Sequence, residues 1–163
     1  MKKQVLLLGT LLGIQLLGHG QDIPQSEVPS VIVNQFNVQF PKATDIEWEL
    51  DGHHYQVEFE TGWNIAHTVW YDREGKMAKH KEDVTTEDLS NAVVQTINSE
   101  FNTYTLDDIE RITENGKVVY RIELNSMTHQ DWEVILDEDG KVLSKKVHSS
   151  STQCFTDRYQ PRC

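Results

Sequence analysis

The segment VPSVIVNQFNVQFP, residues 28–41, is matched by LSNAVVQTINSEF, residues 89–101. Apolar side chains recur at every fourth position in both segments, and this spacing places them on one face of an α-helix. The second set follows the first by 61 positions, so that Val28, Ile32, Phe36 and Phe40 correspond to Leu89, Val93, Ile97 and Phe101. The sequence therefore predicts two amphipathic helices, one at the start of each copy of an internal repeat.

The ends of these helices are marked by prolines and polar residues. Pro29 suits the first turn of the first helix, and Pro41 predicts its end directly after the apolar stripe. In the second copy we expect Thr86 or Asp88 to cap the start of the helix, because both side chains can accept a hydrogen bond from a free backbone amide.

The apolar period changes from four to two after each helix, which is typical of β-strands with one buried face. The clearest alternation is matched between the copies: Tyr55, Val57 and Phe59 correspond to Tyr120, Ile122 and Leu124. Asp51-Gly52 and Asn115-Gly116 predict tight hairpins, because Gly tolerates the positive φ of such turns. A third strand follows in each copy, and a fourth lies near residues 77–81 and 142–147.

These elements predict an α+β fold, a tandem repeat of one helix plus a four-stranded antiparallel unit. Both helices are expected on one face of an eight-stranded sheet. The first strand of the first copy alternates at Ile46, Trp48 and Leu50. Its counterpart breaks the alternation at Ile109 and Ile112, so we expect a bulge or a change of register there.

The first 20 residues have the features of a secretory signal peptide. Lys2 and Lys3 precede an apolar run, Val5 to Leu17, that is followed by small residues at Gly18 and Gly20. The run is shorter than the roughly 20 apolar residues that a membrane-spanning helix needs. We expect cleavage after Gly20 and an exported product, periplasmic or extracellular; an uncleaved N-terminal anchor is the alternative. Both cysteines lie at the far end of the sequence, so there is none near the cleavage site to carry a lipid.

The expected mature chain is long enough for a single domain. We place a linker at residues 21–27, the repeat domain at 28–147 with copies at about 28–84 and 85–147, and a polar tail at 148–163. Loss of two lysines with the signal peptide leaves 13 basic against 26 acidic residues, a formal net charge of −13. Such a surface repels polyanions, so we expect no nucleic-acid partner and no stable membrane insertion after cleavage.

Several of these fold-determining residues carry a family resemblance. The helix end Phe40-Pro41, the stretch Trp48-x-x-Asp-Gly-x-x-Tyr-x-Val-x-Phe59 and the turn Asp72-x-x-Gly-Lys76 resemble PepSY-like domains. These domains are related to the folds of beta-lactamase-inhibitor proteins (BLIP-like) and are common in exported proteins of Bacteroidetes-type bacteria. The resemblance spans residues 28–147, although the second copy lacks the Pro and the Trp.

The resemblance implies a non-enzymatic binding role. Related folds inhibit secreted hydrolases through an open sheet face, and PepSY-type domains have been proposed to restrain peptidases. No catalytic or ligand-binding residue transfers, because the matched positions are core and turn residues. The expected partner is therefore an unidentified exported protein, with a secreted or periplasmic hydrolase as the class that the family suggests.

Strand alternation indicates where such a partner would bind. If the apolar strand residues face the helices, these residues face away from them: His54, Gln56, Glu58, Trp70, Arg121, Glu123 and Ile135. Trp70 and its counterpart Ile135 are large apolar residues on an otherwise polar face, which is typical of interface anchors. Cover by the C-terminal tail or by a second subunit is the alternative for Trp70. Trp48, Trp63 and Trp132 fall on the core side, and we expect them to pack there.

No catalytic motif stands out in the sequence. Four of the seven histidines fall in the first copy, namely His53, His54, His67 and His80. The adjacent His53 and His54 point to opposite faces of a strand, and His67 matches Trp132, a packing position. His-Glu-x-x-His and Cys-x-x-Cys motifs are absent from the sequence. We therefore predict no enzyme, no cofactor and no metal site; a carrier or sensor of a small ligand or metal remains the alternative function.

The polar tail contains both cysteines of the chain. Cys154 and Cys163 lie nine positions apart and are a disulfide candidate in an exported protein. A loop of this size adds about 2.5–3 kcal/mol of stability if its ends are otherwise ordered. The spacing leaves both an intramolecular and an intermolecular pairing open.

Overall fold

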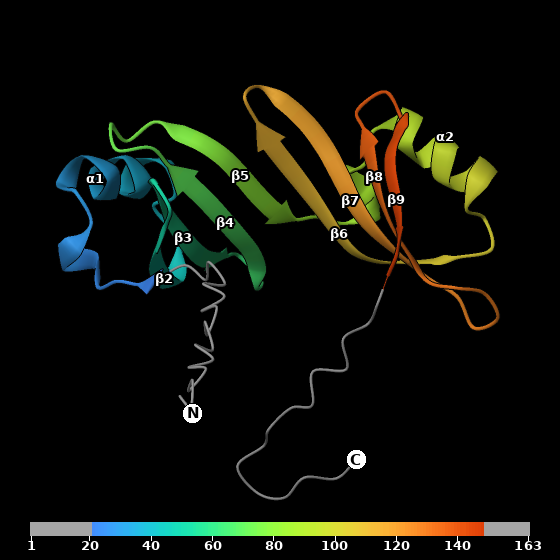
Figure 1. The fold of residues 1–163 in the computed structure, drawn as a ribbon, viewed down its shortest axis with the longest axis horizontal. Coiled ribbons are helices and arrows are strands. Elements are labelled where there is room, and N and C mark those ends of the chain that lie inside the picture. Colours follow the sequence, from blue (N-terminus) through green and yellow to red (C-terminus); the bar gives the residue numbers. More distant parts are fainter. Residues whose placement is uncertain (1–20, 149–163) are drawn as a thin grey trace, which may run out of the picture.

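The structure is a computed structural model that describes residues 21–148 (Figure 1). The predicted signal peptide and the disulfide candidate Cys154 and Cys163 lie outside the described residues. Neither α-helix within the described part of the chain is long and apolar enough to cross a membrane.

A short edge strand, β1 (Gln21–Asp22), precedes two runs of elements that have the same order. The first run is the 3₁₀-helix η1 (Gln25–Glu27), α1 (Ser30–Gln39), β2 (Thr44–Asp51), β3 (His54–Thr61), β4 (Ile65–Tyr71) and β5 (Met77–Asp83). The second run is η2 (Thr86–Asp88), α2 (Asn91–Glu100), β6 (Thr105–Glu114), β7 (Lys117–Asn125), β8 (Trp132–Asp137) and β9 (Val142–Val147). The α+β class is confirmed, and β1 raises the strand number from the expected eight to nine.

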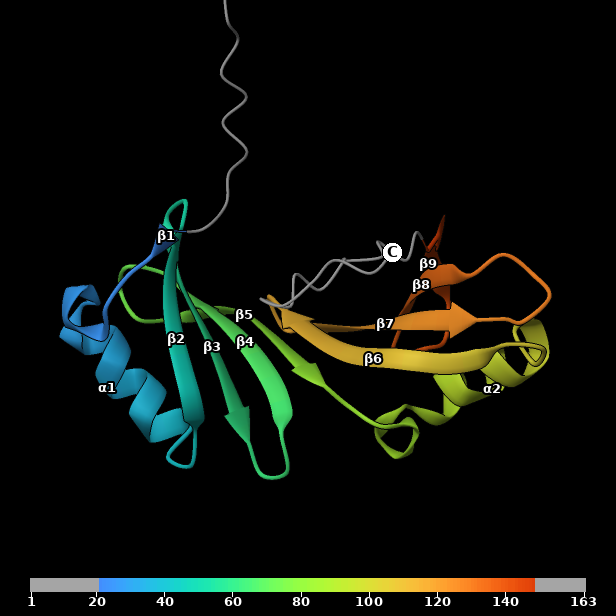
Figure 2. The ribbon, with the colours of Figure 1, turned by 90° about the horizontal axis from the view of Figure 1, so that it is seen from below.

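All nine strands form one antiparallel sheet in sequence order, β1 to β9. The two runs meet where β5 pairs with β6, from Lys79 opposite Glu114 to Asp83 opposite Glu110. Figure 2 shows α1 and α2 on the same side of a curved sheet. We call this side the helix face and the other side the open face, and we call the paired strands β5 and β6 the junction.

Two apolar cores lie between the helices and the sheet. In the first half, Ile32 and Phe36 of α1 pack against the buried residues Trp48, Val57, Phe59, Val69 and Tyr71. In the second half, Val93 and Ile97 of α2 pack against Tyr120, Ile122, Leu124, Val134 and Leu136. Both predicted stripes are confirmed, since seven of their eight residues are buried and Phe40 is partly buried.

The helix starts differ from the prediction. Pro29 lies immediately before α1 rather than in its first turn. The cap of α2 is Ser90, whose side chain accepts a hydrogen bond from the backbone amide three residues on, so the expected cap at Thr86 or Asp88 was wrong. Those two residues belong to η2, which starts with a capping box between Thr85 and Asp88. The sequence holds two capping signals in succession, and the first one opens a 3₁₀ turn.

Two strands contain irregularities at residues with positive φ. In β6 the register shifts at Asp108, which turns Ile109 toward the core and Ile112 toward the open face. This confirms the expected break in alternation. In β2 the register shifts near Asp45. Ile46 and Leu50 are both exposed, so of the three alternating residues only Trp48 is buried.

Candidate functional site

Strand alternation places all seven predicted binding residues on the open face. His54, Gln56 and Glu58 lie on β3 and Trp70 lies on β4, whereas Arg121 and Glu123 lie on β7 and Ile135 lies on β8. The structure thus brings them together as two groups. Three strand-to-strand steps separate β4 from β7, which is about 14 Å across the sheet.

Trp70 is the centre of the first group and is held from two sides. Its indole N–H donates to Asp51 Oδ2 at 3.3 Å, and Lys79 Nζ lies 4.5 Å from the centre of its ring. Gln56 pairs with Trp70 across the strands and donates to Glu58 Oε1 at 3.0 Å. The ring is half-buried and already ordered, so a partner that packs on it loses little side-chain entropy.

Carboxylates gather around the first group. Glu47 and Glu49 of β2 face Glu58 and Gln56 of β3, and Glu60 lies further along the same side of β3. Glu47, Glu58 and Glu60 line a hollow of about 330 Å³. Burial and the neighbouring carboxylate of Glu58 raise the pKa of Glu49. This part of the open face is therefore acidic and complements a basic contact surface.

Polar contacts with neighbouring residues hold the two charged side chains of the second group, Arg121 and Glu123. Arg121, which lies opposite Ile135, donates from Nε to Glu110 Oε2 at 2.6 Å. Glu123 Oε2 lies 3.4 Å from His148 Nε2, and burial raises the pKa of Glu123. These contacts fix the long side chains of β7 on the surface of the open face.

Glu110, which sequence reasoning missed, lies at the junction and contacts Arg121 of the second group. Its side chain is buried, and Lys81 Nζ lies 3.3 Å from its second carboxylate oxygen. Burial opposes ionisation, but the hydrogen bond from Arg121 and the charge of Lys81 outweigh it and hold the pKa of Glu110 below its ordinary value. A glutamate in a strand gives no sequence signal of this burial, because strand glutamates ordinarily face water.

Ile112 and Val119 were also missed and form an apolar patch beside Glu110. They lie opposite each other on β6 and β7 and line a hollow of about 330 Å³. The broken alternation at Ile109 and Ile112 was the available signal, because an apolar residue out of phase with the core must face the other side of the sheet.

The exposed tryptophan of the β3–β4 turn corrects a prediction. Trp63 was expected to pack against the core, but it is 97% exposed. The turn residues Gly62 and Asn64 both have positive φ and interrupt the strand alternation from which the prediction was made. The other two packing predictions are confirmed, since Trp48 is buried and Trp132 packs against the second core.

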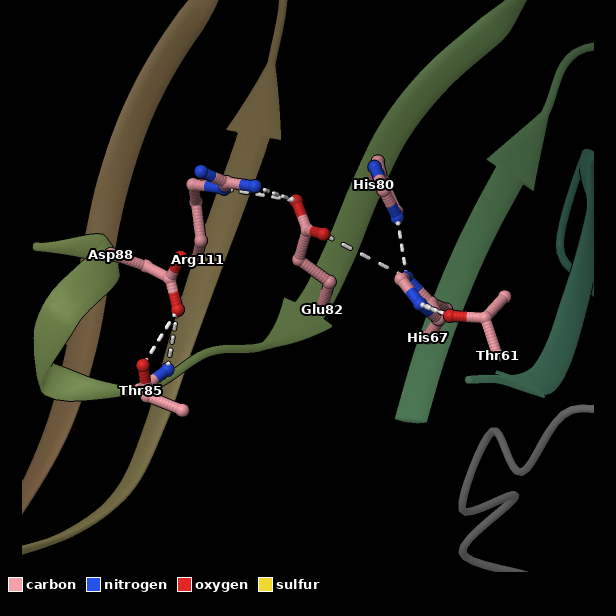
Figure 3. Close-up of polar contacts among 7 residues, drawn as sticks. All are labelled: Thr61, His67, His80, Glu82, Thr85, Asp88 and Arg111. Atoms are coloured by element: carbon pink, nitrogen blue, oxygen red, sulfur yellow. Dashed lines mark hydrogen bonds and ion pairs between the residues drawn. The ribbon is translucent and has the colours of Figure 1, made fainter. Parts of the chain in front are cut away.

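A second polar cluster lies on the helix face of β4, β5 and β6 (Figure 3). His67 Nδ1 is 3.1 Å from His80 Nε2 and 3.9 Å from Glu82 Oε2, while Thr61 Oγ1 is 2.7 Å from His67 Nε2. Arg111 donates to Glu82 Oε1 from Nε at 2.9 Å and from Nη2 at 2.8 Å. Burial lowers the pKa of both histidines.

The packing role expected of His67 is confirmed, because its ring stacks on Phe59 with centres 4.9 Å apart. Sequence reasoning missed the meeting of His67 with His80 and Glu82. These residues meet only because β4 pairs with β5 in the register that sets His67 opposite Glu82 and Val69 opposite His80. The spacing of these residues along the sequence does not predict that register.

Comparison with known proteins agrees with this architecture. The profile of a family described as beta-lactamase-inhibitor-like and PepSY-like matches residues 15–77 and 54–144. The chain belongs to this PepSY-like family. The family resemblance expected from Phe40-Pro41 and the strand motifs is thereby confirmed. No curated protein matches the chain.

Solved structures from Bacteroides share the fold. A BLIP-like protein from Bacteroides fragilis has a TM-score of 0.62 and 18% identity, covering 80% of this chain and 92% of that protein. A DUF2874 family protein from Bacteroides ovatus has a TM-score of 0.63 and 17% identity, with 78% and 92% coverage. A candidate periplasmic protein from Bacteroides eggerthii has a TM-score of 0.63 and 17% identity, with 74% and 88% coverage. At these identities the likeness concerns the fold alone.

Proposed function

We propose that this PepSY-like protein is an exported, non-catalytic binding module whose open sheet face contacts another exported protein. The observation that carries the proposal is a half-buried tryptophan, Trp70, on an otherwise polar open face, with the apolar pair Ile112 and Val119 two and three strands away on the same face. Apolar residues surrounded by polar ones are typical of protein interfaces, and Trp is enriched among the residues that dominate their affinity.

The charge near Trp70 supports a partner with a basic contact surface. Four carboxylates lie on β2 and β3, on the side of Trp70 away from the junction, namely those of Glu47, Glu49, Glu58 and Glu60. Complementary charge accelerates association and selects among partners, while the buried apolar contacts supply most of the affinity. An exported hydrolase is the partner class that we propose, with inhibition as the result, because the family is described as beta-lactamase-inhibitor-like.

The other predicted features fit this role. Export is supported by the description of a similar solved structure as a candidate periplasmic protein. The repeated order of one helix and four strands supports two copies of one unit, divided near residue 85 at the start of η2. We take residues 28–147 as the binding domain, after a signal peptide at residues 1–20 and a linker at 21–27.

Capture from the producing cell tests the proposal. The mature protein, residues 21–163, is immobilised and exposed to periplasmic and extracellular fractions, and the bound proteins are identified by mass spectrometry. We expect one enriched protein, and we expect Trp70→Ala to weaken its binding about 30-fold or more, as for a dominant interface residue. Trp63→Ala is the matched control, because it removes a tryptophan that is fully exposed at a turn.

The two tryptophan variants separate the possible outcomes. Unchanged binding by Trp63→Ala together with weak binding by Trp70→Ala supports the open face. Loss of binding only in Trp63→Ala would move the contact to the β3–β4 turn and overturn the proposal. If the captured protein is a hydrolase, its activity with and without the mature protein then tests inhibition directly.

A further inference from the structure

The polar cluster on the helix face has the composition of a metal site. His67 Nδ1, His80 Nε2 and a carboxylate oxygen of Glu82 all lie within 4.8 Å of one another. Two imidazoles and one carboxylate form a ligand set used by zinc enzymes, in which a fourth position stays open to water or another donor. The cluster is on the opposite side of the sheet from the proposed binding face, so the two assignments are independent.

Two of the three donor–donor distances are close to those around a tetrahedral ion, and the third, from His80 Nε2 to the Glu82 carboxylate, is within 4.8 Å. Donors at about 2.1 Å from zinc lie about 3.4 Å apart. The distance from His67 Nδ1 to His80 Nε2 is 3.1 Å, and that from His67 Nδ1 to Glu82 Oε2 is 3.9 Å. Side-chain shifts of about 0.5 Å would bring both distances to the expected value, without a change in strand register.

Neighbouring residues orient the donors, as outer-shell partners do in metal sites. Thr61 Oγ1 can accept a hydrogen bond from the Nε2–H group of His67, which leaves the Nδ1 lone pair directed at His80 and Glu82. Arg111 holds Oε1 of Glu82 and leaves Oε2 free for the cluster. The negative charge of Asp88, which hydrogen-bonds with Thr85 (Figure 3), also favours the charged form of Arg111.

The surroundings keep the imidazoles neutral and limit water. The centre of the Phe40 ring lies 6.1 Å from that of His67 and 5.5 Å from that of His80, and the Phe59 ring stacks on His67. Burial lowers the pKa of both histidines, so their lone pairs are available near neutral pH. A metal can replace the hydrogen bond between His67 and His80 through a change of tautomer alone, because neither ring has to lose a net proton.

We propose that His67, His80 and Glu82 bind one Zn²⁺ ion, with Thr61 and Arg111 as orienting residues. The ion joins β4 to β5, the first strand of the junction. It retains one coordination position for water or a donor from another molecule. Zinc is the chosen ion because two imidazoles and a carboxylate, with a fourth position left open, are a ligand set that it uses in proteins.

Zinc titration of the purified, metal-free mature protein tests this site. Isothermal titration calorimetry, with metal content measured after dialysis, is expected to give one zinc ion per chain. We expect His80→Gln and Glu82→Gln to lower the affinity about 100-fold or more, and Thr61→Val, which removes only the orienting hydroxyl, to lower it about tenfold. Two controls, His53→Gln at an exposed turn and the Cys154→Ser/Cys163→Ser double variant, should bind zinc as the parent protein does.

A spectroscopic measurement keeps the proposal testable if a variant fails to fold. In the unaltered mature protein, ¹⁵N chemical shifts of the imidazoles should show zinc bound to Nδ1 of His67 and to Nε2 of His80, with the other four histidines of the mature chain unchanged. Zinc binding that is lost in the cysteine variant, that persists in His80→Gln, or that never reaches one ion per chain would each overturn the assignment.

Discussion

The two halves of the sheet fill equivalent positions with different chemistry. In the first half, Phe40 at the end of α1 covers His67 and His80. The predicted repeat matches these histidines with Trp132 and Lys145, and Lys145 Nζ lies 4.3 Å from the centre of the Trp132 ring. Near the end of α2, the second half therefore has the Trp132 ring with the Lys145 cation over it. Near the end of α1, the first half has the two imidazoles of His67 and His80.

The position of each half within the sheet accounts for this difference. β5 lies inside the sheet, so Glu82 meets Arg111 of β6 and is partly buried. β9 is the last strand of the described sheet, and Val147, which corresponds to Glu82, is exposed there. Polar groups at the junction can therefore be enclosed and paired, while those at the edge face water. The junction, rather than either core, is therefore where the buried polar interactions of this fold are concentrated.

The matched turn glycines give the largest expected difference between the halves. Gly140, in the β8–β9 turn, has φ +77°, and an added Cβ would lie 2.5 Å from the carbonyl oxygen of Ala92 in α2. Gly75, in the β4–β5 turn, has φ +84°, but its Cβ would lie 3.3 Å from Cγ2 of Val31 and no closer than 3.5 Å to the Val31 backbone. We expect Gly140→Ala to lower the free energy of unfolding by about 3 kcal/mol or more, since it adds a backbone clash to the left-handed strain.

For Gly75→Ala we expect the left-handed strain alone, about 1–2 kcal/mol. Urea unfolding of both variants and the parent protein measures the two values. Equal losses would show that α2 is free to move away from the β8–β9 turn. The hydroxyl of Thr96 in α2 donates to the Gly140 carbonyl at 2.7 Å, and we expect this hydrogen bond to hold α2 against the turn. Equal losses would contradict that expectation.

Glu110→Gln tests the junction on the open face. The variant keeps the shape of the side chain but removes the charge that Arg121 and Lys81 neutralise, so we expect a loss of about 1.5–3 kcal/mol at pH 7. Because the folded-state pKa of Glu110 is lowered, its contribution is complete above the unfolded-state pKa and disappears as the pH falls through the folded-state value. The difference between parent and variant should therefore shrink as the pH falls from 5 to 3.

Comparing the two proteins at each pH cancels the groups that titrate alike in both. Asp83 responds to the substitution as well, because burial and the charge of Glu110 raise its pKa and the variant removes that charge. A stability difference that stays constant down to pH 3 would contradict the ion-pair assignment at the junction.

Lys145→Ala should give the smallest effect, because its cation lies over two aromatic rings at the exposed edge of the sheet. Nζ lies 4.3 Å from the Trp132 ring centre and 5.2 Å from that of Phe101. Exposed cation–π contacts contribute about 0.5–1 kcal/mol, and we expect a loss of that size in urea unfolding. A loss as large as that of Glu110→Gln would contradict the distinction between junction and edge.

Local periodicity explains why most of the fold could be predicted from the sequence. Stripes such as Ile32 and Phe36 predicted the helices, and two-residue alternation predicted which strand side faces them. β1 could not be predicted, because two residues carry no period. Its pairing of Gln21 with Leu50 depends on a register that only the folded sheet defines.

The candidate sites could be predicted only where they depend on alternation. Trp70 was found on the open face because its neighbours in β4 are core residues. Glu110, and the contact of His67 with His80, depend on strand register and on burial at the junction, which are properties of the assembled sheet. Trp63 was misplaced because a turn with two positive φ values interrupts the alternation on which the prediction relied.

Hydroxyl-radical footprinting of the mature protein, alone and bound to its captured partner, is the most direct test that the open face is the binding surface, because it reports side-chain exposure on each face separately. We expect slower oxidation of Trp70, Ile112 and Val119 in the complex, and unchanged oxidation of the exposed residues Val38 on α1 and Met127 in the β7–β8 loop. Protection of Val38 or Met127 with no change at Trp70 would place the partner elsewhere and contradict the open face as the binding surface.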